Sequence, residues 1–366
     1  MLIQDITAVL EEIAPIHYAE SYDNSGLIIG NPKTKARGAL LCLDVTLAVL
    51  KEAEQKSCNL IICHHPLIFK GLKKIQGNNE VEQCVIYAIQ KEIAIYACHT
   101  NLDNVLNRGV NQKIAQKLRL TDLQILKPMQ NELVKCVTYC PEPYAEEVTQ
   151  AMWKAGAGQI GNYNNCSFTM EGTGTFQGNE FTTPFLGTRG ELEKVIEKRI
   201  EVLLEKHKVN QVLQALRESH PYEEVAYEVM PILNTDTTKG AGLIGSTQNP
   251  MSGATFLEHV KEALGLQVIK HTAPPNAPIE RVALCGGSGS FLTHNAMKAQ
   301  AQVFISADFK YHDYFETSEA MMICDIGHYE SEIFTLEIFM EIIKEKFPTF
   351  AVLFTEISSN PVNYYH

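Results

Sequence analysis

Residues 59–66 read Asn-Leu-Ile-Ile-Cys-His-His-Pro, a short apolar run that ends in two histidines and a proline. A continuous apolar run of this length is typical of a strand that is buried on both faces. Pro66 disfavours helical geometry at His65, so we expect the strand to stop at the histidines. The same pattern recurs along the chain, because other strand-like runs also end at residues with useful chemistry. This recurrence predicts both the fold and the candidate site.

Strand-like runs alternate with helical patterns at both ends of the chain. Near the N-terminus we expect strands at 38–45, 59–63 and 93–98, and helices at 2–13, 46–56, 80–91 and 105–118. Near the C-terminus we expect strands at 280–285, 303–306, 322–325 and 351–357, and a helix at 331–346. Strands that alternate with helices predict βαβ units and a mostly parallel sheet, which is an α/β fold.

The middle of the chain has a different order of elements. Strand patterns at 133–139, 165–170, 196–203 and 225–232 accompany helical patterns at 143–155 and 209–218. This order is close to β-α-β-β-α-β, the split βαβ or ferredoxin-like plan. We therefore predict an α+β domain at 128–234, inserted into an α/β domain formed by 1–127 and 235–366.

Composition restricts the classes of function. The 366 residues contain 31 Lys and Arg against 43 Asp and Glu, a formal charge of −12. Nucleic-acid and anionic-membrane binding is therefore disfavoured, because it needs clustered cations. No uninterrupted apolar run is long enough to span a bilayer. The ten cysteines form no CxxC pair and several lie in apolar runs, so we expect thiols in the core. The N-terminus lacks the cations of a signal peptide, so we expect a cytoplasmic protein.

Polar residues gather where the expected strands end. Ligands of open α/β sheets bind beyond the carboxyl ends of the strands. The residues found there are Asp44, His64, His65, His99, Asp103, the loop Gly286–Ser290, Asp308 and His328. The middle segment contributes no such cluster, which supports the interpretation that it is an insertion.

Five of the residues near strand ends predict a metal site. Imidazole and carboxylate groups are ligands of divalent metals, and His328 and Glu332 share a helical face if a helix begins at about Tyr329. The predicted ligands are His64, His65, Asp103, His328 and Glu332. Five ligands exceed what one tetrahedral zinc needs, and they suit two ions roughly 3.5 Å apart with a bridging carboxylate.

Structural alternatives remain open for these residues. The His64-His65-Pro66 stretch could be a packing or capping feature. Asp103 could cap the N-terminus of the helix expected from 105, and Glu332 could complement the positive end of its own helix. Glu330 would point elsewhere and is the weaker candidate ligand.

Candidates for acid-base or substrate-orienting roles are Asp308, His312 and His99. Asp308 and His312 could equally belong to a polar helix start. The loop Gly286–Ser290 could bind an anion through backbone amides at a helix N-terminus, although it lacks the Gly-Lys-Ser/Thr of a Walker motif.

Five motifs occur in a characteristic order, namely Tyr22-Asp-Asn-Ser-Gly-Leu, Cys63-His-His-Pro-Leu, His99-Thr-Asn-Leu-Asp, Ala307-Asp-Phe-Lys-Tyr-His-Asp and Gly327-His-Tyr-Glu-Ser-Glu. With them the sequence resembles the Nif-three-like family, whose bacterial members carry the name GTP cyclohydrolase 1 type 2 homologue. Residues 158–166 and 220–227 resemble the inserted CutA/PII-like domain of its longer members. Ala307 departs from the Thr-Gly that members often carry before the aspartate.

The resemblance implies a two-lobed α/β fold interrupted by a ferredoxin-like, CutA/PII-like insertion. It implies metal ligands at the same five residues, and a toroidal homohexamer. Two divalent ions per chain are expected, with zinc favoured and manganese, iron, cobalt and nickel open. The leading hypothesis is a two-metal hydrolase of a nucleotide or phosphoester, GTP cyclohydrolase-like by resemblance. The alternative is a non-enzymatic metal carrier or regulatory protein that uses the insertion.

Overall fold

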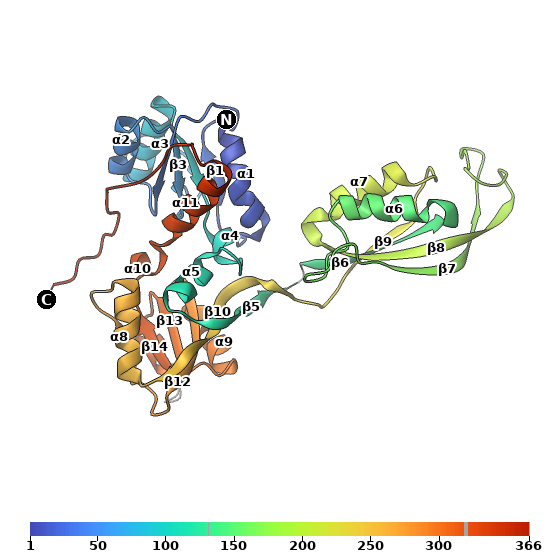
Figure 1. The fold of residues 1–366 in the computed structure, drawn as a ribbon. Coiled ribbons are helices and arrows are strands. Elements are labelled where there is room, and N and C mark those ends of the chain that lie inside the picture. Colours follow the sequence, from blue (N-terminus) through green and yellow to red (C-terminus); the bar gives the residue numbers. More distant parts are fainter. Residues whose placement is uncertain (131, 318–320, 366) are drawn as a thin grey trace. The chain divides into compact units, whose positions relative to one another are not determined.

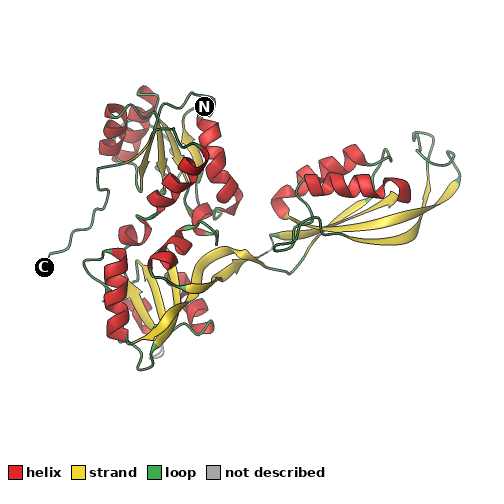
Figure 2. Ribbon diagram, viewed as in Figure 1, coloured by secondary structure: helices red, strands yellow, loops and turns green. Residues whose placement is uncertain are grey.

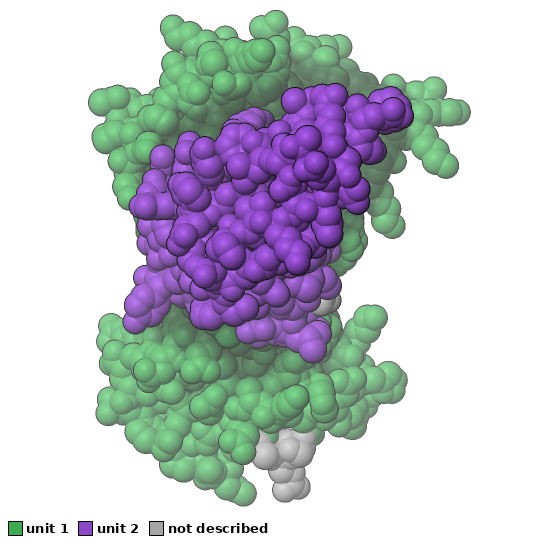
Figure 3. Space-filling model, turned by 90° about the vertical axis from the view of Figure 1, so that its right-hand side faces the viewer, with its two compact units in different colours: residues 1–128, 237–366 green, residues 129–236 purple. Residues whose placement is uncertain are grey.

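The computed structural model describes residues 1–130, 132–317 and 321–365 and contains two compact units. Unit 1 comprises residues 1–128 and 237–366, and unit 2 comprises residues 129–236 (Figure 3). The chain thus leaves unit 1 once, forms unit 2, and returns.

Unit 1 contains a five-stranded sheet with the order β1-β4-β3-β2-β15. Strands β2 (Ala39–Cys42), β3 (Leu60–Cys63), β4 (Ala94–Ala97) and β15 (Val352–Phe354) are parallel, and β1 (Gly26–Ile29) is antiparallel to β4. Every residue of β2, β3 and β4 is buried, which explains why these strands read as continuous apolar runs.

Helices cover both faces of this sheet (Figure 1). Side chains of α2 (Leu47–Gln55) and α3 (Glu80–Gln90) pack on one face, and those of α1 (Ile3–Ile13) and α11 (Thr335–Lys346) pack on the other. α11 follows the short helix α10 (His328–Glu332) as a separate helix, so the single helix expected over 331–346 is divided.

The second sheet of unit 1 has six strands in the order β11-β14-β13-β12-β10-β5. Its centre is parallel and consists of β12 (Ile279–Ser288), β13 (Val303–Ala307) and β14 (Met322–Asp325), while β10 (Asp236–Met251) and β11 (Lys270–His271) pair antiparallel to it. The remaining elements of this half are β5 (Thr121–Met129), α5 (Val110–Lys117), α8 (Gly253–Leu264) and α9 (Thr293–Lys298). The parallel strands therefore divide between two sheets instead of forming one.

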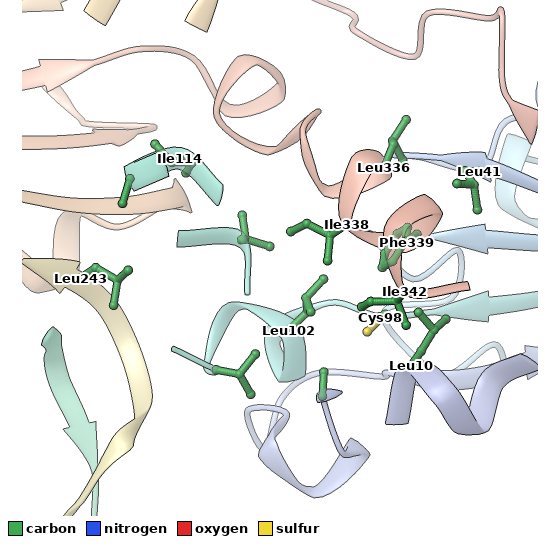
Figure 4. Close-up of a cluster of buried hydrophobic side chains, with 14 of the residues drawn as sticks. Leu10, Leu41, Cys98, Leu102, Ile114, Leu243, Leu336, Ile338, Phe339 and Ile342 are labelled. Carbon is green, nitrogen blue, oxygen red and sulfur yellow. The ribbon is translucent and has the colours of Figure 1, made fainter. Parts of the chain in front are cut away.

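One apolar cluster joins the two sheets of unit 1 (Figure 4). Helix α11 contributes Phe339 and its neighbours, and they pack with Leu41 of β2. The same cluster continues through Leu102 and Ile114 to Leu243 of β10. Because this core is continuous, the ends of strands from both sheets can be held in fixed positions.

Unit 2 is a four-stranded antiparallel sheet with the order β7-β8-β6-β9. Along the chain its elements are β6 (Leu133–Pro141), α6 (Glu142–Lys154), β7 (Phe168–Gln177), β8 (Leu192–Glu205), α7 (Val209–Ser219) and β9 (Tyr227–Pro231). Both helices lie on the same side of the sheet (Figure 2). The β-α-β-β-α-β order is the one expected, whereas the CutA/PII-like character of this unit stays a prediction.

The ten cysteines are free, and nine of them are buried, with Cys166 partly exposed. The prediction that the thiols lie in the core is confirmed for those nine. Among the helices that the structure describes, none combines the length and the apolar composition needed to cross a membrane.

Replacing Phe339 by alanine is expected to destabilise unit 1. The ring is fully buried in the cluster that joins the two sheets, so the change should lower the free energy of unfolding by about 3–5 kcal/mol. Phe354→Ala in β15 is the matched control, because Phe354 is 44% exposed and should cost less than about 1 kcal/mol. Denaturant unfolding measures both variants, and equal midpoints would contradict the assignment of this core.

Candidate metal centre

Four histidines meet at the ends of strands from both sheets of unit 1. His64 and His65 directly follow β3, His99 lies between β4 and the short helix α4 (Thr100–Asp103), and His328 is the first residue of α10 after β14. The ring of His65 lies 5.0, 5.3 and 5.2 Å from the rings of His64, His99 and His328, measured between centroids. The rings therefore form one compact group.

The backbone conformation of Gly327 brings His328 into this group. Gly327 has φ +87°, which lets the chain turn sharply from β14 into α10. A Cβ atom at this position would lie 2.3 Å from Glu330 Oε2. The turn also places Glu332 one helical turn after His328, on the same face as that histidine.

Each of the four histidines is oriented through its Nδ1 atom. The acceptors are Cys98 O for His64 (2.9 Å), Asp44 Oδ1 for His65 (2.7 Å), Asp23 Oδ1 for His99 (2.7 Å) and Asp308 Oδ2 for His328 (2.6 Å). Because a carbonyl or carboxylate oxygen can only accept, the Nδ1 atom carries the proton in each pair. A neutral imidazole held in this way offers the lone pair of Nε2, as metal-binding histidines do.

Two carboxylates face these nitrogens. Glu332 is 3% exposed, and its Oε2 lies 2.9 Å from His65 Nε2 and 3.0 Å from His328 Nε2. Its Oε1 lies 3.7 Å from His64 Nε2, and Asp103 Oδ1 lies 3.6 Å from that same nitrogen. Glu332 therefore stands between the nitrogens of three histidines.

Three buried atoms of this cluster make no hydrogen bond within the part of the chain that the structure describes. They are His64 Nε2, Asp103 Oδ1 and Glu332 Oε2. An unsatisfied buried polar atom costs about 1–3 kcal/mol, so such atoms are rare in folded proteins. Bound cations would give these atoms partners, and the residues present therefore fit divalent metal.

The pKa shifts show that the cluster attracts positive charge. Burial and the nearby Glu332 raise the pKa of Asp103 to about 7. Burial opposes protonation of His65, but Asp44 and Glu332 outweigh it and raise the pKa of His65 to about 10. The Glu332 carboxylate, 3.0 Å from His328 Nε2, is the largest influence on His328 and raises its pKa to about 9. Protons thus supply the positive charge that a divalent ion would supply in their place.

Within this cluster, two groups of side chains have their ligand atoms within 4.8 Å of one another. One group is His64, His65 and His99, and the other is His65, His328 and Glu332. His65 belongs to both groups, and Asp103 adjoins the first through His64. The five residues predicted as ligands therefore lie together in the fold, and His99 lies with them.

The other predicted residues are placed differently. Asp308 accepts a hydrogen bond from His328 Nδ1, so it orients a histidine. His312 is exposed in the 3₁₀ helix Tyr311–Phe315, where it packs against Tyr311 and Phe315. Among the described residues, the groups that could hold a metal do not include His312.

Sequence reasoning did not assign the orienting roles of Asp23 and Asp44. The sequence marks both as polar residues at positions where a site can form, since Asp44 follows a strand and Asp23 lies in a polar turn. The capping role considered for Asp103 is wrong, because Asp103 is the last residue of α4 and the next helix begins at Val110.

The glycine loop Gly286–Ser290 supports the carboxylate of Glu332. The amide of Gly286 donates to Asn111 Oδ1 and that of Gly287 donates to Ser331 Oγ, both at 2.8 Å. These two amides are therefore not free to bind an anion. A Cβ at Gly287 would lie 2.1 Å from Glu332 Oε1, so the loop fits closely against that side chain.

A pocket of about 670 Å³ opens beside His65 and His328. The polar side chains in its wall include Asp44, Lys270, Asp308, Asp325, Glu330 and Tyr364. A small molecule in this pocket would reach the two histidines, which is the arrangement that an active site or a carrier site needs.

The fold and the cluster define a class of protein, a two-sheet α/β protein with a histidine and carboxylate group suited to divalent metal. The sequence model of Duf34/NIF3 (NGG1p interacting factor 3) matches residues 1–361. The chain therefore belongs to the Duf34/NIF3 family, and the predicted family resemblance is confirmed.

Curated relatives and solved structures agree with this family. A Bacillus subtilis protein named GTP cyclohydrolase 1 type 2 homolog is 36% identical over 335 residues, which are 90% of this chain and 89% of that protein. A protein of the same name from Staphylococcus epidermidis is 32% identical over 371 residues and covers 100% of both chains. The structure of a Bacillus cereus protein related to NIF3 superposes with a TM-score of 0.84 at 35% identity, covering 100% of this chain and 99% of that one.

Gly287→Ala is expected to displace Glu332 and empty the site of metal. Gly265, which ends α8, is a matched control, since its φ of +66° equals that of Gly287 (+63°) within a few degrees and a Cβ there meets no atom within 4 Å. Both alanines incur left-handed strain of about 1–2 kcal/mol, but only Gly287→Ala should lower metal affinity, by roughly tenfold or more. Elemental analysis of the purified variants measures this, and equal metal content in the two would refute a ligand role for Glu332.

Proposed function

We propose that this protein binds two divalent metal ions per chain and uses them to hydrolyse a nucleotide or phosphoester. The observation that carries the proposal is the convergence of three Nε2 atoms, those of His64, His65 and His328, on one buried carboxylate, Glu332. Three buried atoms of the cluster also lack a hydrogen-bond partner among the described residues. The relatives named GTP cyclohydrolase 1 type 2 homolog make cyclohydrolase-like chemistry one form of this proposal.

The ligands divide naturally around Glu332. His64 and Asp103, with His99 beside them, would hold one ion, and His65 with His328 would hold the other. Glu332 contacts both sides and would bridge the pair. Zinc is the favoured metal, and manganese, iron, cobalt and nickel also suit this ligand set.

Bound ions of this kind lower the pKa of a coordinated water and polarise a substrate oxygen. The protein's own contribution is orientation. Cys98 O, Asp44, Asp23 and Asp308 fix the four rings, and the pocket beside His65 and His328 admits the substrate. Burial of Glu332 and His64 keeps bulk water from competing for the ligand atoms.

The family resemblance and the free, buried thiols support two further parts of the proposal. We propose that the chain assembles into a toroidal homohexamer and acts in the cytoplasm, where reduced cysteines persist. Light scattering of the purified protein measures the assembly, and a monomer would contradict it.

Purified wild-type protein, prepared without chelator, is expected to contain about two divalent ions per chain. His64→Ala removes a fully buried ligand and should lower that number, whereas His271→Ala changes an exposed histidine in β11 and should leave it unchanged. Elemental analysis gives the count. A wild-type protein that takes up no divalent ion would overturn the proposal.

The metal-loaded protein is expected to hydrolyse at least one member of a panel of nucleotides and phosphoesters. His64→Ala should reduce that rate in proportion to its loss of metal, and His271→Ala should not. A metal-replete wild type that hydrolyses no panel member would favour the non-enzymatic alternative, a metal carrier or a regulatory protein that uses unit 2.

A further inference from the structure

Unit 2 contains a pocket of its own, with a volume of about 550 Å³. Its floor is the face of the β7–β8 hairpin that carries Glu197 and Arg199, because residues two apart on a strand share a face. Its walls come from the segment that connects β7 to β8 and from the residues after α7. This volume lies in the range of sites for small molecules.

Aromatic rings form one wall of this pocket. The ring of Tyr222 lies 5.7 Å from that of Phe176 and 6.4 Å from that of Phe185, and Phe185 lies 5.5 Å from Tyr144. Phe176 and Tyr222 are partly buried, and Phe185 is 46% exposed. Such a wall favours a ligand with an aromatic or aliphatic body.

A nearly buried carboxylate lies beside this wall. Glu197 is 8% exposed, and its Oε1 accepts a hydrogen bond of 2.9 Å from the hydroxyl of Tyr222. Within the described chain, no hydrogen bond reaches its Oε2. That oxygen sits directly over Gly174, where a Cβ would lie 2.1 Å away. A carboxylate withdrawn from water is stabilised by a cationic partner, and the pocket leaves room for one.

An arginine donor lies on the same face, two residues further along β8. Arg199 Nη2 pairs with Glu201 Oε1 at 2.8 Å, which fixes the guanidinium. Its Nε atom is buried and has no hydrogen-bond partner among the described residues. The pocket therefore offers an acceptor and a donor side by side, each with capacity left unused.

Three further glutamates line the pocket; Glu224 is exposed, and the other two have partners. Glu171 pairs with Lys198 at 2.9 Å, and Glu223 accepts a hydrogen bond from the amide of Thr183. A Cβ at Gly172, which is opposite Glu197 in the ladder, would meet no atom within 4 Å. The space next to the Glu197 carboxylate is therefore open.

We propose that unit 2 binds an amino acid with an apolar side chain in this pocket. Its ammonium group faces Glu197, its carboxylate accepts from Arg199, and its side chain packs against Tyr222, Phe176 and Phe185. This site is separate from the histidine cluster of unit 1, since its lining residues all belong to unit 2.

Three matched probes test this assignment on the full-length protein by isothermal titration calorimetry. L-phenylalanine carries both charged groups, 2-phenylethylamine carries only the ammonium, and 3-phenylpropionate carries only the carboxylate. L-phenylalanine should bind best, and loss of either charged group should weaken binding by roughly tenfold or more. Binding of 3-phenylpropionate as tight as that of L-phenylalanine, or no binding of any probe, would overturn the proposal.

Substitutions in the pocket test which residue contacts each charged group of the ligand. Glu197→Gln should weaken binding of L-phenylalanine and 2-phenylethylamine roughly tenfold and leave binding of 3-phenylpropionate unchanged. Arg199→Met should weaken binding of 3-phenylpropionate roughly tenfold and leave binding of 2-phenylethylamine unchanged. Gly172→Leu places a side chain in the open space, where its Cβ would meet no atom within 4 Å, and should abolish binding of all three probes. Glu147→Gln, on the exposed face of α6, is the charge-matched control and should bind like the wild type. Circular dichroism verifies folding of each variant, and undiminished binding of L-phenylalanine by folded Gly172→Leu would place the ligand elsewhere and refute this site.

Discussion

The buried carboxylate of Glu332 is the group on which the candidate metal centre depends. A charge removed from water is expensive unless partners surround it, and Glu332 has three histidines around it. Those histidines hold the pKa of Glu332 well below its usual range despite its burial. They in turn are fixed by Cys98 O, Asp44 and Asp308 through Nδ1. Groups outside the cluster thus orient the histidine rings, and the rings surround the Glu332 carboxylate.

That arrangement requires the two halves of unit 1 to be rigidly joined. His64 and His65 follow a strand of one sheet, whereas His328 and Glu332 follow a strand of the other. Distances near 3 Å between their side chains allow little relative movement. The core cluster through α11 provides the rigidity, because its apolar contacts run without interruption from one sheet to the other (Figure 4).

The sequence could predict the strand ends and the candidate ligands, because continuous apolar runs and the polar residues after them are local signals. Which strands pair is not local, and so the strand pattern predicted one mostly parallel sheet; only the family resemblance implied two lobes. Strand β10 was missed because Gly240, Gly242 and Gly245 weaken its strand pattern. Asp23 and Asp44 were visible as polar residues, but their partners His99 and His65 are far away in the sequence. Only the fold shows that these aspartates orient imidazoles.

Charge in the pocket beside the cluster limits how the proposed hydrolase could hold its substrate. The wall contains Asp44, Asp308, Asp325 and Glu330 but, among the described lining residues, one lysine and no arginine, and that lysine, Lys270, already pairs with Asp325 at 2.7 Å. Once the histidines are neutral, as metal ligands are, the side chains of this wall would repel a phosphate group that approaches them. Under the proposed function, the bound ions must supply the attraction for an anionic substrate as well as the reactive water. The same acidic residues that hold the imidazoles thus make binding of such a substrate depend on the metal.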